Sequence, residues 1–426
     1  MITISKNFLS SSSGLGTLVN IIELIFTYIS LLIYTDALLI LVLSGGAGQS
    51  DVVSYNTSVY HVCFLIIYGT TLFFLAIRWK HVLYVVKKNK SFLLILLLAI
   101  FSVLWSEKRD ATAIASIRLV GTSMFGLHLA VRYSLKNQVN LLAQMFGWAS
   151  ILSILFAILL PKYGIMGEGM WRGIYTHKNG LGYIMVQAVS AFLITRKLKD
   201  KAKISNLYIV ISISLIVLSD SATSLVGIVY LLVLLLVIQP FRLSYRSMIF
   251  SLASTSTILF LLFISLIANA KAIAEFLGRD LTFTGRTDIW IAVWDMIMNR
   301  PWLGYGFSGF WHGLDGPSHY VWTRTGWPMT HSHNGFMELW INLGLIGLLI
   351  FIFVYLRNIR DSLKLIRLSS SFTSFFPILS LGLIFMQNLT ESPLKNSQFC
   401  WMIFTCLSFT LPKELASSKT DLIARR

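Results

Sequence analysis

Two imidazoles and an amide stand directly before a long apolar run, in a segment that reads TRTGWPMTHSHNGFMELWINLGLIGLLIF and spans 323–351. His331 and His333 are two residues apart, and Asn334 comes immediately before the apolar residues. A histidine exchanges its proton near neutral pH and can therefore serve as a general base. At the edge of a bilayer, His333 can reach both a hydroxyl in water and an electrophile attached to a lipid. The segment predicts His333 as a base, and the alternative is an interfacial histidine without chemistry.

The neighbours of His333 are expected to play smaller parts. Asn334 or a backbone carbonyl would fix its tautomer. His331 is two residues away and is expected, in an extended loop, to point in the opposite direction from His333. Two histidines without a third ligand in the same stretch make a weak metal site. The sequence therefore predicts no metal and no cofactor.

A short helix is expected in the external loop upstream, in the sequence TFTGRTDIWIAVWDMIMNRPWLGYGFSGFW. Thr284 can cap it, Asp288 suits its first turn, Arg300 suits its last turn and Pro301 ends it. It has an apolar stripe of Ile289, Ala292, Val293, Met296 and Ile297. Such a helix lies along the bilayer surface or packs on the bundle. Arg286 near its N-terminus suits a phosphate, because free backbone N–H groups also favour anions there; the alternative is an ordinary interfacial arginine.

The turn after this helix alternates glycines with aromatic residues. Gly304, Gly306 and Gly309 are interleaved with Tyr305 and Phe307. Glycine lets a backbone approach a ligand closely, and aromatic faces suit sugar rings. A tight turn packed by its own aromatic residues is the equal alternative.

A second basic cluster lies in WRGIYTHKNGLG, at the outer start of the predicted sixth span. It contains Arg172, His177, Lys178 and Asn179. Cations at a helix N-terminus again suit a phosphate group.

Arg118 lies within a predicted span, where an arginine is costly and is a functional candidate. It requires an anion, which is either a carboxylate such as Glu391 or Asp220, or a phosphate of a ligand. Structural ion pairing is the alternative for all three residues.

The bulk composition identifies the class of protein. Of 426 residues, 56% are hydrophobic and only 12% are charged, about half of the charged fraction of a soluble domain. The formal charge of +17 falls in short clusters between apolar runs, which disfavours a nucleic-acid partner. Cys63, Cys400 and Cys406 lie in apolar segments without metal spacing. The sequence predicts an all-α, polytopic membrane protein.

Hydropathy predicts a transmembrane helical bundle of about 12 spans. The spans are expected near 18–43, 59–77, 91–105, 111–131, 139–160, 179–195, 205–219, 222–239, 248–270, 335–356, 373–389 and 398–411. The first is read as an uncleaved anchor. Residues 1–426 are expected to form one integral membrane domain, in which the loop 271–334 between spans 9 and 10 carries the short amphipathic helix.

The distribution of lysine and arginine predicts the orientation. With the N-terminus in the cytoplasm, the inner loops and tails hold 23 basic residues and the outer segments hold 11. Both termini are therefore expected to be cytoplasmic, and the loop 271–334 faces outside. No internal repeat is visible and the notable polar residues are biased to one face, which disfavours a transporter.

These side chains together match one chemical need, which is to hold a lipid-linked pyrophosphate while a sugar hydroxyl is activated. Pyrophosphate leaves readily once its charge is neutralised, so one base suffices and a general acid is unnecessary.

Five stretches carry a resemblance to the O-antigen ligase/polymerase superfamily of bacterial membrane proteins. They are VLWSEKRDATAIASIR, HKNGLG, GRTDIWIAVWDMIMNRPWLGYGFSGFW, HNGFMELWINLGLIG and QNLTESPL. The resemblance implies a metal-independent inverting glycosyltransferase with His333 as general base and Arg286 as the loop arginine. Arg118 and Lys178 are further pyrophosphate candidates. The supporting residues are Asn334, His177, Asn179, Glu391, Trp290 and Tyr305.

Two positions depart from the family pattern. Many members have an arginine where this chain has Ala222 and Thr223, so one phosphate-binding cation is missing or Arg172 replaces it. Trp290 stands where leucine is common.

The segments FTGRTDIW and GYGFSGFW most resemble the exopolysaccharide-polymerase branch. That branch implies polymerisation of an undecaprenyl-diphosphate-linked oligosaccharide at the periplasmic face of the bacterial inner membrane, with membrane lipids, a chain-length regulator and export proteins as partners. A ligase that moves the glycan to lipid A core or to protein is the alternative, followed by a transporter of lipid-linked glycans.

Overall fold

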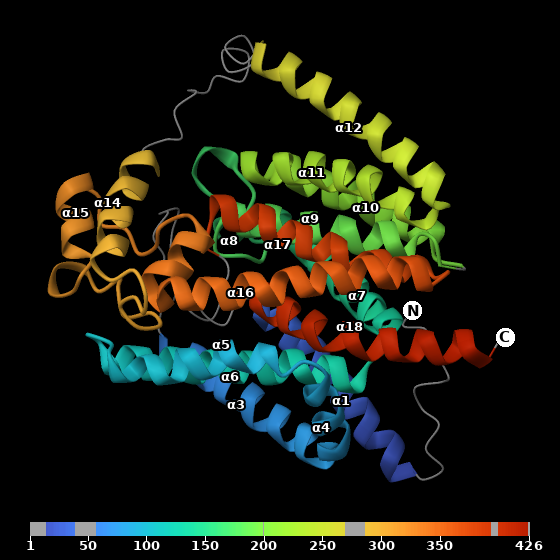
Figure 1. Cartoon of the computed structure of the whole chain (residues 1–426), viewed down its shortest axis with the longest axis horizontal. Coiled ribbons are helices and arrows are strands. Elements are labelled where there is room, and N and C mark those ends of the chain that lie inside the picture. Colours follow the sequence, from blue (N-terminus) through green and yellow to red (C-terminus); the bar gives the residue numbers. More distant parts are fainter. Residues whose placement is uncertain (1–13, 39–56, 199, 269–285, 393–398, 425–426) are drawn as a thin grey trace. The chain divides into compact units, whose positions relative to one another are not determined.

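The computed structural model describes residues 14–38, 57–198, 200–268, 286–392 and 399–424 (Figure 1). Within these ranges the secondary structure is helical, and the one β-bridge, between Ile165 and Trp171, is isolated. The all-α prediction is confirmed for this part of the chain. In their described parts, all twelve predicted spans overlap a helix.

Six of the described helices are long and apolar enough to cross a membrane by themselves. They are Gly16–Tyr34, Arg109–Arg132, Leu135–Leu159, Ala222–Arg242, Gly335–Leu368 and Phe372–Thr390. A seventh candidate is a bent pair, His61–Ile77 with Trp79–Lys88. The chain is therefore a multi-pass helical membrane protein, and the count of twelve crossings stays a prediction.

The chain divides into two compact units. The first contains the described parts of 1–67, 137–196 and 200–221. Its elements are α1 (Gly14–Tyr34), the first half of α3 (Thr57–Ile77), most of α7 (Leu135–Leu159), α8 (Pro161–Gly164), η3 (Gly167–Gly169), α9 (Lys178–Thr195) and α10 (Ala202–Leu218). α9 and α10 pack on each other through the stacked rings of Phe192 and Tyr208, whose centroids are 5.1 Å apart.

The second unit contains the described parts of 68–136, 197–199 and 222–426. Its helices are α4 (Trp79–Lys88), α5 (Ser91–Phe101), α6 (Arg109–Arg132), α11 (Ala222–Ile238), α12 (Tyr245–Ala268), α14 (Arg286–Asn299), α15 (His319–Thr325), α16 (Gly335–Leu368), α17 (Phe376–Thr390) and α18 (Phe399–Ala424). Short 3-10 turns lie at Ser102–Leu104, Gln239–Arg242, Gly313–Asp315 and Phe372–Phe375.

The core of the second unit is built where α18 packs on α6 and α16. Gly126 allows close approach, because a Cβ there would lie 2.7 Å from the carbonyl oxygen of Met402. Trp401 is fully buried, and its indole N–H donates to the Ser123 hydroxyl at 2.9 Å. The Trp401 ring thus adds a large apolar surface to this core, and the hydrogen bond leaves no unpaired donor in it.

The loop helix exists and packs on protein. α14 lies beside α15 and the N-terminal end of α16 (Figure 1). Its stripe is buried at Ile289, Ala292, Val293 and Ile297, with Met296 partly buried against the same cluster. Of the two expected settings, packing on the bundle is confirmed for this face. Thr284 and the rest of 271–285 lie outside the described residues.

Candidate active site

The loop before α16 is anchored by the first residues of that helix. The Asn334 side-chain oxygen accepts from the backbone N–H groups of Phe336 and Met337, at 3.0 and 3.1 Å. This is an N-cap, which satisfies two donors that the first turn leaves free. Asn334 therefore does not fix the His333 tautomer as expected. The group that contacts His333 Nδ1 is the Glu391 carboxylate, at 3.2 Å.

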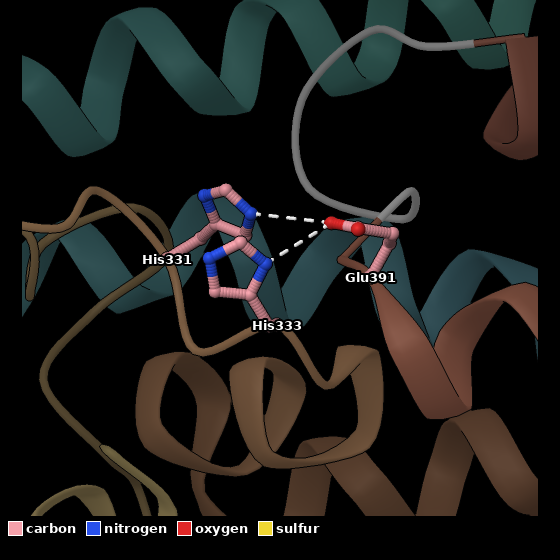
Figure 2. Close-up of side chains that lie close together, drawn as sticks. All are labelled: His331, His333 and Glu391. Atoms are coloured by element: carbon pink, nitrogen blue, oxygen red, sulfur yellow. Dashed lines mark hydrogen bonds and ion pairs between the residues drawn. The ribbon is translucent and has the colours of Figure 1, made fainter. Parts of the chain in front are cut away.

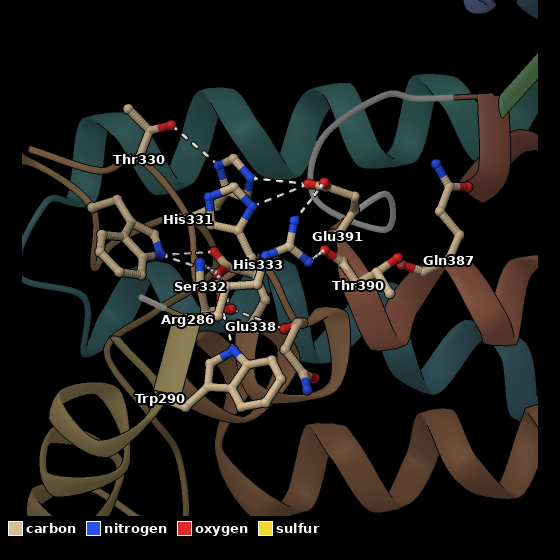
Figure 3. A network of polar contacts seen from close by, with 12 residues as sticks. Arg286, Trp290, Thr330, His331, Ser332, His333, Glu338, Gln387, Thr390 and Glu391 are labelled. Carbon is tan, nitrogen blue, oxygen red and sulfur yellow. Dashed lines mark hydrogen bonds and ion pairs between the residues drawn. The ribbon is translucent and has the colours of Figure 1, made fainter. Parts of the chain in front are cut away.

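A buried carboxylate holds the residue between the two histidines. Glu338 is only 3% exposed and accepts from the Ser332 N–H at 3.1 Å and the Ser332 hydroxyl at 3.0 Å. It also accepts from the indole N–H of Trp311 at 2.9 Å and the amide of Asn342 at 3.1 Å. The indole of Trp290 donates to the Ser332 carbonyl at 3.0 Å (Figure 3). These bonds hold the histidine loop in place, because the backbone N–H, the carbonyl and the hydroxyl proton of Ser332 all have partners.

The two histidines point the same way, contrary to expectation. Their ring centroids are 4.0 Å apart, and both rings face Glu391 (Figure 2). In an extended chain, residues i and i+2 lie on the same face, so opposite directions do not follow from that conformation. His333 itself departs from it, with a φ of +51°. His331 Nε2 lies 3.5 Å from the carboxylate oxygen that also meets His333.

Arg286 binds the same carboxylate from the start of α14. One guanidinium nitrogen lies 3.3 Å from Glu391 Oε1, and the other donates to the carbonyl oxygen of Thr390 (Figure 3). Glu391 caps the C-terminus of α17. Segments separated by about 100 residues of sequence thus meet at one carboxylate, which is the centre of the candidate site.

Electrostatics keep this carboxylate ionised. Burial alone would raise the pKa of Glu391, but hydrogen bonds from His331 and His333 and the positive charge of Arg286 hold that pKa well below its usual range. The negative charge in turn favours a proton on His333 Nδ1, the nitrogen that faces it. His333 Nε2 has no hydrogen-bond partner among the described residues, so a lone pair there is available to a ligand proton.

The same side chains have a donor set that a metal ion can use. One ligand atom each from His331, His333 and Glu391 lie within 4.8 Å of one another, and two imidazoles with a carboxylate suit a divalent transition metal. The sequence showed no third ligand because Glu391 comes from a distant segment. Arg286 contacts the other carboxylate oxygen of Glu391. Its positive charge would repel a metal ion bound to the same carboxylate.

The glycine-rich turn supports a broken helix. α16 is interrupted at Gly344, whose φ is +68°, and the break leaves carbonyl groups without helical partners. The N–H groups of Tyr305 and Gly306 fill these places, because each donates at 2.9 Å to the carbonyl of Ile341 or Asn342. The turn therefore satisfies the backbone of α16 on one side of the break.

The other side of the break is satisfied by the residues that end α14. The Leu345 N–H donates to the Pro301 carbonyl at 2.8 Å, and Trp105 donates from its indole to the Leu303 carbonyl at 3.0 Å. A Cβ on Gly304 would lie 2.6 Å from the Ile341 carbonyl oxygen. The backbone that comes close to Gly304 is therefore that of α16 and not a ligand. Of the two interpretations of this turn, the packed tight turn fits the structure.

Tyr305 takes part in this support. Its ring is 3% exposed, and its hydroxyl donates to the Met296 carbonyl at 3.1 Å. Burial raises the pKa of Tyr305. A ring so deeply buried offers no face to a sugar, so its role is to hold the turn.

The remaining predicted residue of this unit is Arg118, which is half-buried on α6. Its carbonyl oxygen accepts from the Tyr68 hydroxyl at 3.3 Å. Its assignment to pyrophosphate stays a prediction.

The basic cluster of the first unit is organised around the start of α9. The His177 ring nitrogen Nδ1 accepts from the Asn179 N–H at 3.1 Å and caps the helix. Lys178 lies 3.6 Å from Asp220, and the Asn179 side-chain oxygen accepts from the Ser221 hydroxyl at 3.1 Å. The predicted cations and caps thus meet the end of α10, directly before Ala222 and Thr223, which begin α11.

Arg172 has a different setting in the same unit. It is 1% exposed and donates to the carbonyl groups of Tyr163 at 2.7 Å and Lys162 at 3.2 Å. These contacts are typical of an arginine that holds a loop together, and they fit a structural role better than the expected replacement for the missing family arginine.

Sequence reasoning missed Ser332 and Glu338, although both position the site. A carboxylate in the first turn of an apolar helix was the available signal, because a buried acid requires donors. It missed Thr390 because a backbone carbonyl carries no sequence signal.

Comparison with known proteins gives two partial matches. A family model described as O-antigen ligase matches residues 207–352, a range that includes Arg286, both histidines and Glu338. A Rickettsia felis protein named "Putative polysaccharide ligase" is 25% identical over 252 residues, which are 55% of this chain and 60% of that relative. The chain therefore matches about three fifths of the relative's length. Neither match names the exopolysaccharide-polymerase branch. The matched range contains two of the five resembling segments, GRTDIWIAVWDMIMNRPWLGYGFSGFW and HNGFMELWINLGLIG. Both matches support the resemblance of this chain to the O-antigen ligase/polymerase superfamily.

Proposed function

We propose that this protein is a membrane glycosyltransferase that moves an oligosaccharide from a lipid diphosphate to a hydroxyl group of an acceptor. The observation that carries the proposal is the setting of His333. Its Nδ1 faces an ionised carboxylate, its Nε2 is uncommitted among the described residues, and Arg286 stands on the same carboxylate. A base and an anion-binding cation are thus fixed side by side.

The proposed reaction needs one proton transfer. His333 Nε2 takes the proton of the acceptor hydroxyl while that oxygen forms a bond to the anomeric carbon of the donor sugar. The bond from this carbon to the diphosphate oxygen breaks, and the lipid diphosphate leaves with the electron pair. Attack opposite the leaving group inverts the anomeric configuration. Glu391 stabilises the imidazolium that results, so the positive charge is matched where it develops.

The leaving group needs positive charge but no proton. Arg286 is proposed to bind the diphosphate, since the guanidinium is planar, always charged and suited to two oxygens at once. Arg118 and Lys178 are further proposed ligands. This division of labour makes a metal ion unnecessary in the proposed reaction.

The acceptor decides between two candidate functions. We propose polymerisation of undecaprenyl-diphosphate-linked repeat units, with the site on the periplasmic side of the inner membrane, because the loop segments resemble that branch. A chain-length regulator and export proteins are the proposed partners. Transfer to lipid A core or another acceptor is the second candidate, supported by the word ligase in the description of both comparisons.

The experiment uses purified protein in liposomes with undecaprenyl-diphosphate-linked repeat units as the only substrate. A ladder of longer lipid-linked chains identifies a polymerase, whereas a reaction that starts only after lipid A core is added identifies a ligase. His333→Ala is expected to lower turnover by about 10²–10⁴-fold, the usual contribution of general base catalysis. Turnover near the wild-type rate would remove His333 as the base.

Two controls address the metal alternative. His331→Ala is expected to be milder than His333→Ala, and chelation with EDTA is expected to leave turnover unchanged. An equal loss in both variants together with inactivation by EDTA would instead assign the three side chains to a metal ion.

A further inference from the structure

The segment 78–90, expected as an inner loop, contains a helix. α4 follows the apolar helix His61–Ile77 at an angle of 94°. A helix at a right angle to a span runs along the bilayer surface when the span crosses the bilayer. Such helices bury an apolar face at the boundary between headgroups and acyl chains, so the faces of α4 show whether it fits this place.

The exposed side of α4 has the pattern of a surface-lying helix. Trp79 is 56% exposed and Leu83, one turn later, is 46% exposed. Val85 lies on the opposite side and is buried against the protein. Lys80 and Lys87 project next to the exposed apolar pair, about 100° and 80° around the helix from Trp79 at the regular helical spacing. Long basic side chains beside an inserted apolar strip can extend to lipid phosphates.

The charge of this surface is uniformly positive. Residues 78–90 contain five lysine or arginine residues and no aspartate or glutamate. Lys80, Lys87 and Lys88 form no ion pair with an acidic side chain that the structure describes. Lys88 lies over the Tyr84 ring, 4.4 Å from its centroid. The charges are therefore available to an external anion.

The bundle holds the end of α4 in place. Arg357 donates to the Lys88 carbonyl at 2.6 Å and to the Asn89 side-chain oxygen at 2.7 Å. Asn89 is fully buried and donates to the Ser408 carbonyl at 2.7 Å. A cationic surface that is fixed before binding loses little conformational entropy when a ligand arrives.

α16 connects this surface to the opposite membrane face. Asn334 caps its start beside His333, and Arg357 lies 23 residues later. At 1.5 Å per residue an unbroken helix of this length would span roughly 34 Å, close to the thickness of a bilayer's hydrocarbon core, and the break at Gly344 makes this an approximate path length. α4 thus lies at the membrane face away from the candidate active site.

We propose that α4 is a binding surface for anionic phospholipid headgroups of the leaflet opposite the active site. Trp79 and Leu83 insert among the acyl chains, and Lys80, Lys87 and Lys88 bind the phosphate groups. This function does not depend on the proposed glycosyl transfer. The charge match favours anionic lipids, because an uncharged headgroup gives the three lysines no counter-charge.

The test measures lipid selectivity of the full chain. Purified protein in a neutral detergent is incubated with equal amounts of phosphatidylglycerol and phosphatidylcholine, and the retained lipids are counted by native mass spectrometry. The variant K80Q/K87Q/K88Q is compared with K197Q/K203Q/K364Q, which removes the same charge from exposed lysines elsewhere. Size-exclusion profiles and thermal midpoints establish that both variants fold.

The α4 variant is expected to lose at least about tenfold in its preference for phosphatidylglycerol, since each lysine near an anionic surface contributes on the order of fivefold. The control variant is expected to keep that preference, and salt is expected to weaken it in the wild-type protein. Equal preference in both variants, or no preference in the wild-type protein, would overturn the proposal.

Discussion

At the scale of single residues, one carboxylate organises the candidate site. Glu391 meets Arg286 through one oxygen and both imidazoles through the other. Its charge orients His333 and partly neutralises Arg286. A donor diphosphate would therefore compete with Glu391 for the same guanidinium, so substrate binding and base orientation are coupled through this residue.

Replacing the carboxylate with an amide tests this coupling. The lowered pKa of Glu391 means that the folded protein favours the ionised form. Its stabilisation is fully present above the ordinary carboxyl pKa and is lost as the pH falls through the lowered value. We expect Glu391→Gln to lower turnover about 10–100-fold and unfolding free energy by about 1–3 kcal/mol at neutral pH.

Thermal midpoints at several pH values measure the second effect. The gap between wild type and Glu391→Gln should narrow below about pH 4, where the carboxyl of the unfolded chain takes up a proton. A gap that stays unchanged down to about pH 2 would contradict the ionised assignment.

Arg286→Lys tests whether the planar guanidinium is needed. A lysine keeps the charge but cannot contact Thr390 and Glu391 with two separate nitrogens. We expect turnover to fall at least about tenfold, with the protein still folded. Arg300→Lys is the matched control, because Arg300 lies at the other end of the same helix region and pairs with Glu107 on the exposed surface. Equal turnover in Arg286→Lys and wild type would make Arg286 an interfacial residue.

The residue types of the site were predictable, but their contacts were only partly so. His333 stands out because an imidazole directly before a long apolar run can exchange a proton near neutral pH, and Arg286 because it lies at the start of a predicted helix, where anions are favoured. The contact between His333 and Glu391 was not predicted, because it joins segments 58 residues apart. The direction of His331 was predicted wrongly, because side chains at i and i+2 of an extended chain share one face. The positive φ at His333 leaves no signal in the residue type.

At the scale of elements, the site depends on a helix that is broken and then held. The outer turns of α16 carry the Asn334 cap and the Glu338 network, while the rest of the helix continues into the bundle beyond Gly344. The segment 301–306 bonds to both sides of the break. The position of the histidine loop relative to the rest of α16 therefore depends on these backbone hydrogen bonds.

Gly344→Ala is expected to damage this junction. Its φ of +68° disfavours any Cβ, and a Cβ there would also collide with the Trp302 carbonyl oxygen. Gly326 is a milder comparison, since it has the same φ of +68° but a ψ of 11° and nothing within 4 Å of a Cβ, whereas Gly344 has a ψ of −176°, a combination that only glycine adopts readily. We expect about 1 kcal/mol of destabilisation for Gly326→Ala, the cost of the backbone angle alone. Gly344→Ala is expected to cost at least about 3 kcal/mol.

Thermal midpoints and turnover of the two variants check this prediction. Gly344→Ala should lose activity together with stability, whereas Gly326→Ala should keep most of its turnover. Similar shifts in both variants would show that the collision is relieved and that the junction tolerates movement.

Elements with strong periodicity were predicted well. The stripe of α14 is buried as expected because its apolar residues recur at helical spacing and Pro301 ends the helix. α4 was missed, since a ten-residue segment with several lysines resembles a positively charged loop. The break at Gly344 was also missed, because glycine is common in spans and its φ depends on the partner that fills the gap.

At the scale of the whole molecule, hydropathy located the helices but does not show which of them cross the bilayer. All twelve predicted ranges overlap helices, yet six of the described helices satisfy length and hydropathy by themselves. The shorter helices, such as α5 and α10, pack against neighbouring helices, α5 against α6 and α16 and α10 against α9. Composition reports the class of protein, whereas the number of crossings depends on how short helices share the bilayer with longer ones.

The orientation can be tested by labelling single cysteines in intact cells. In a background without Cys63, Cys400 and Cys406, Trp327→Cys lies in the predicted external loop and Lys87→Cys lies on α4. Both positions are exposed, so a membrane-impermeant maleimide can reach either one from the correct side. The excess of basic residues in the predicted inner loops makes us expect labelling of Trp327→Cys in cells whose outer barrier is opened, and of Lys87→Cys only after the membrane is dissolved. Detergent-dissolved samples should label equally and serve as the control. The reverse pattern would place His333 in the cytoplasm, and an outer-face polymerisation would then be impossible while the chemistry of the His333 and Glu391 pair would remain open to test.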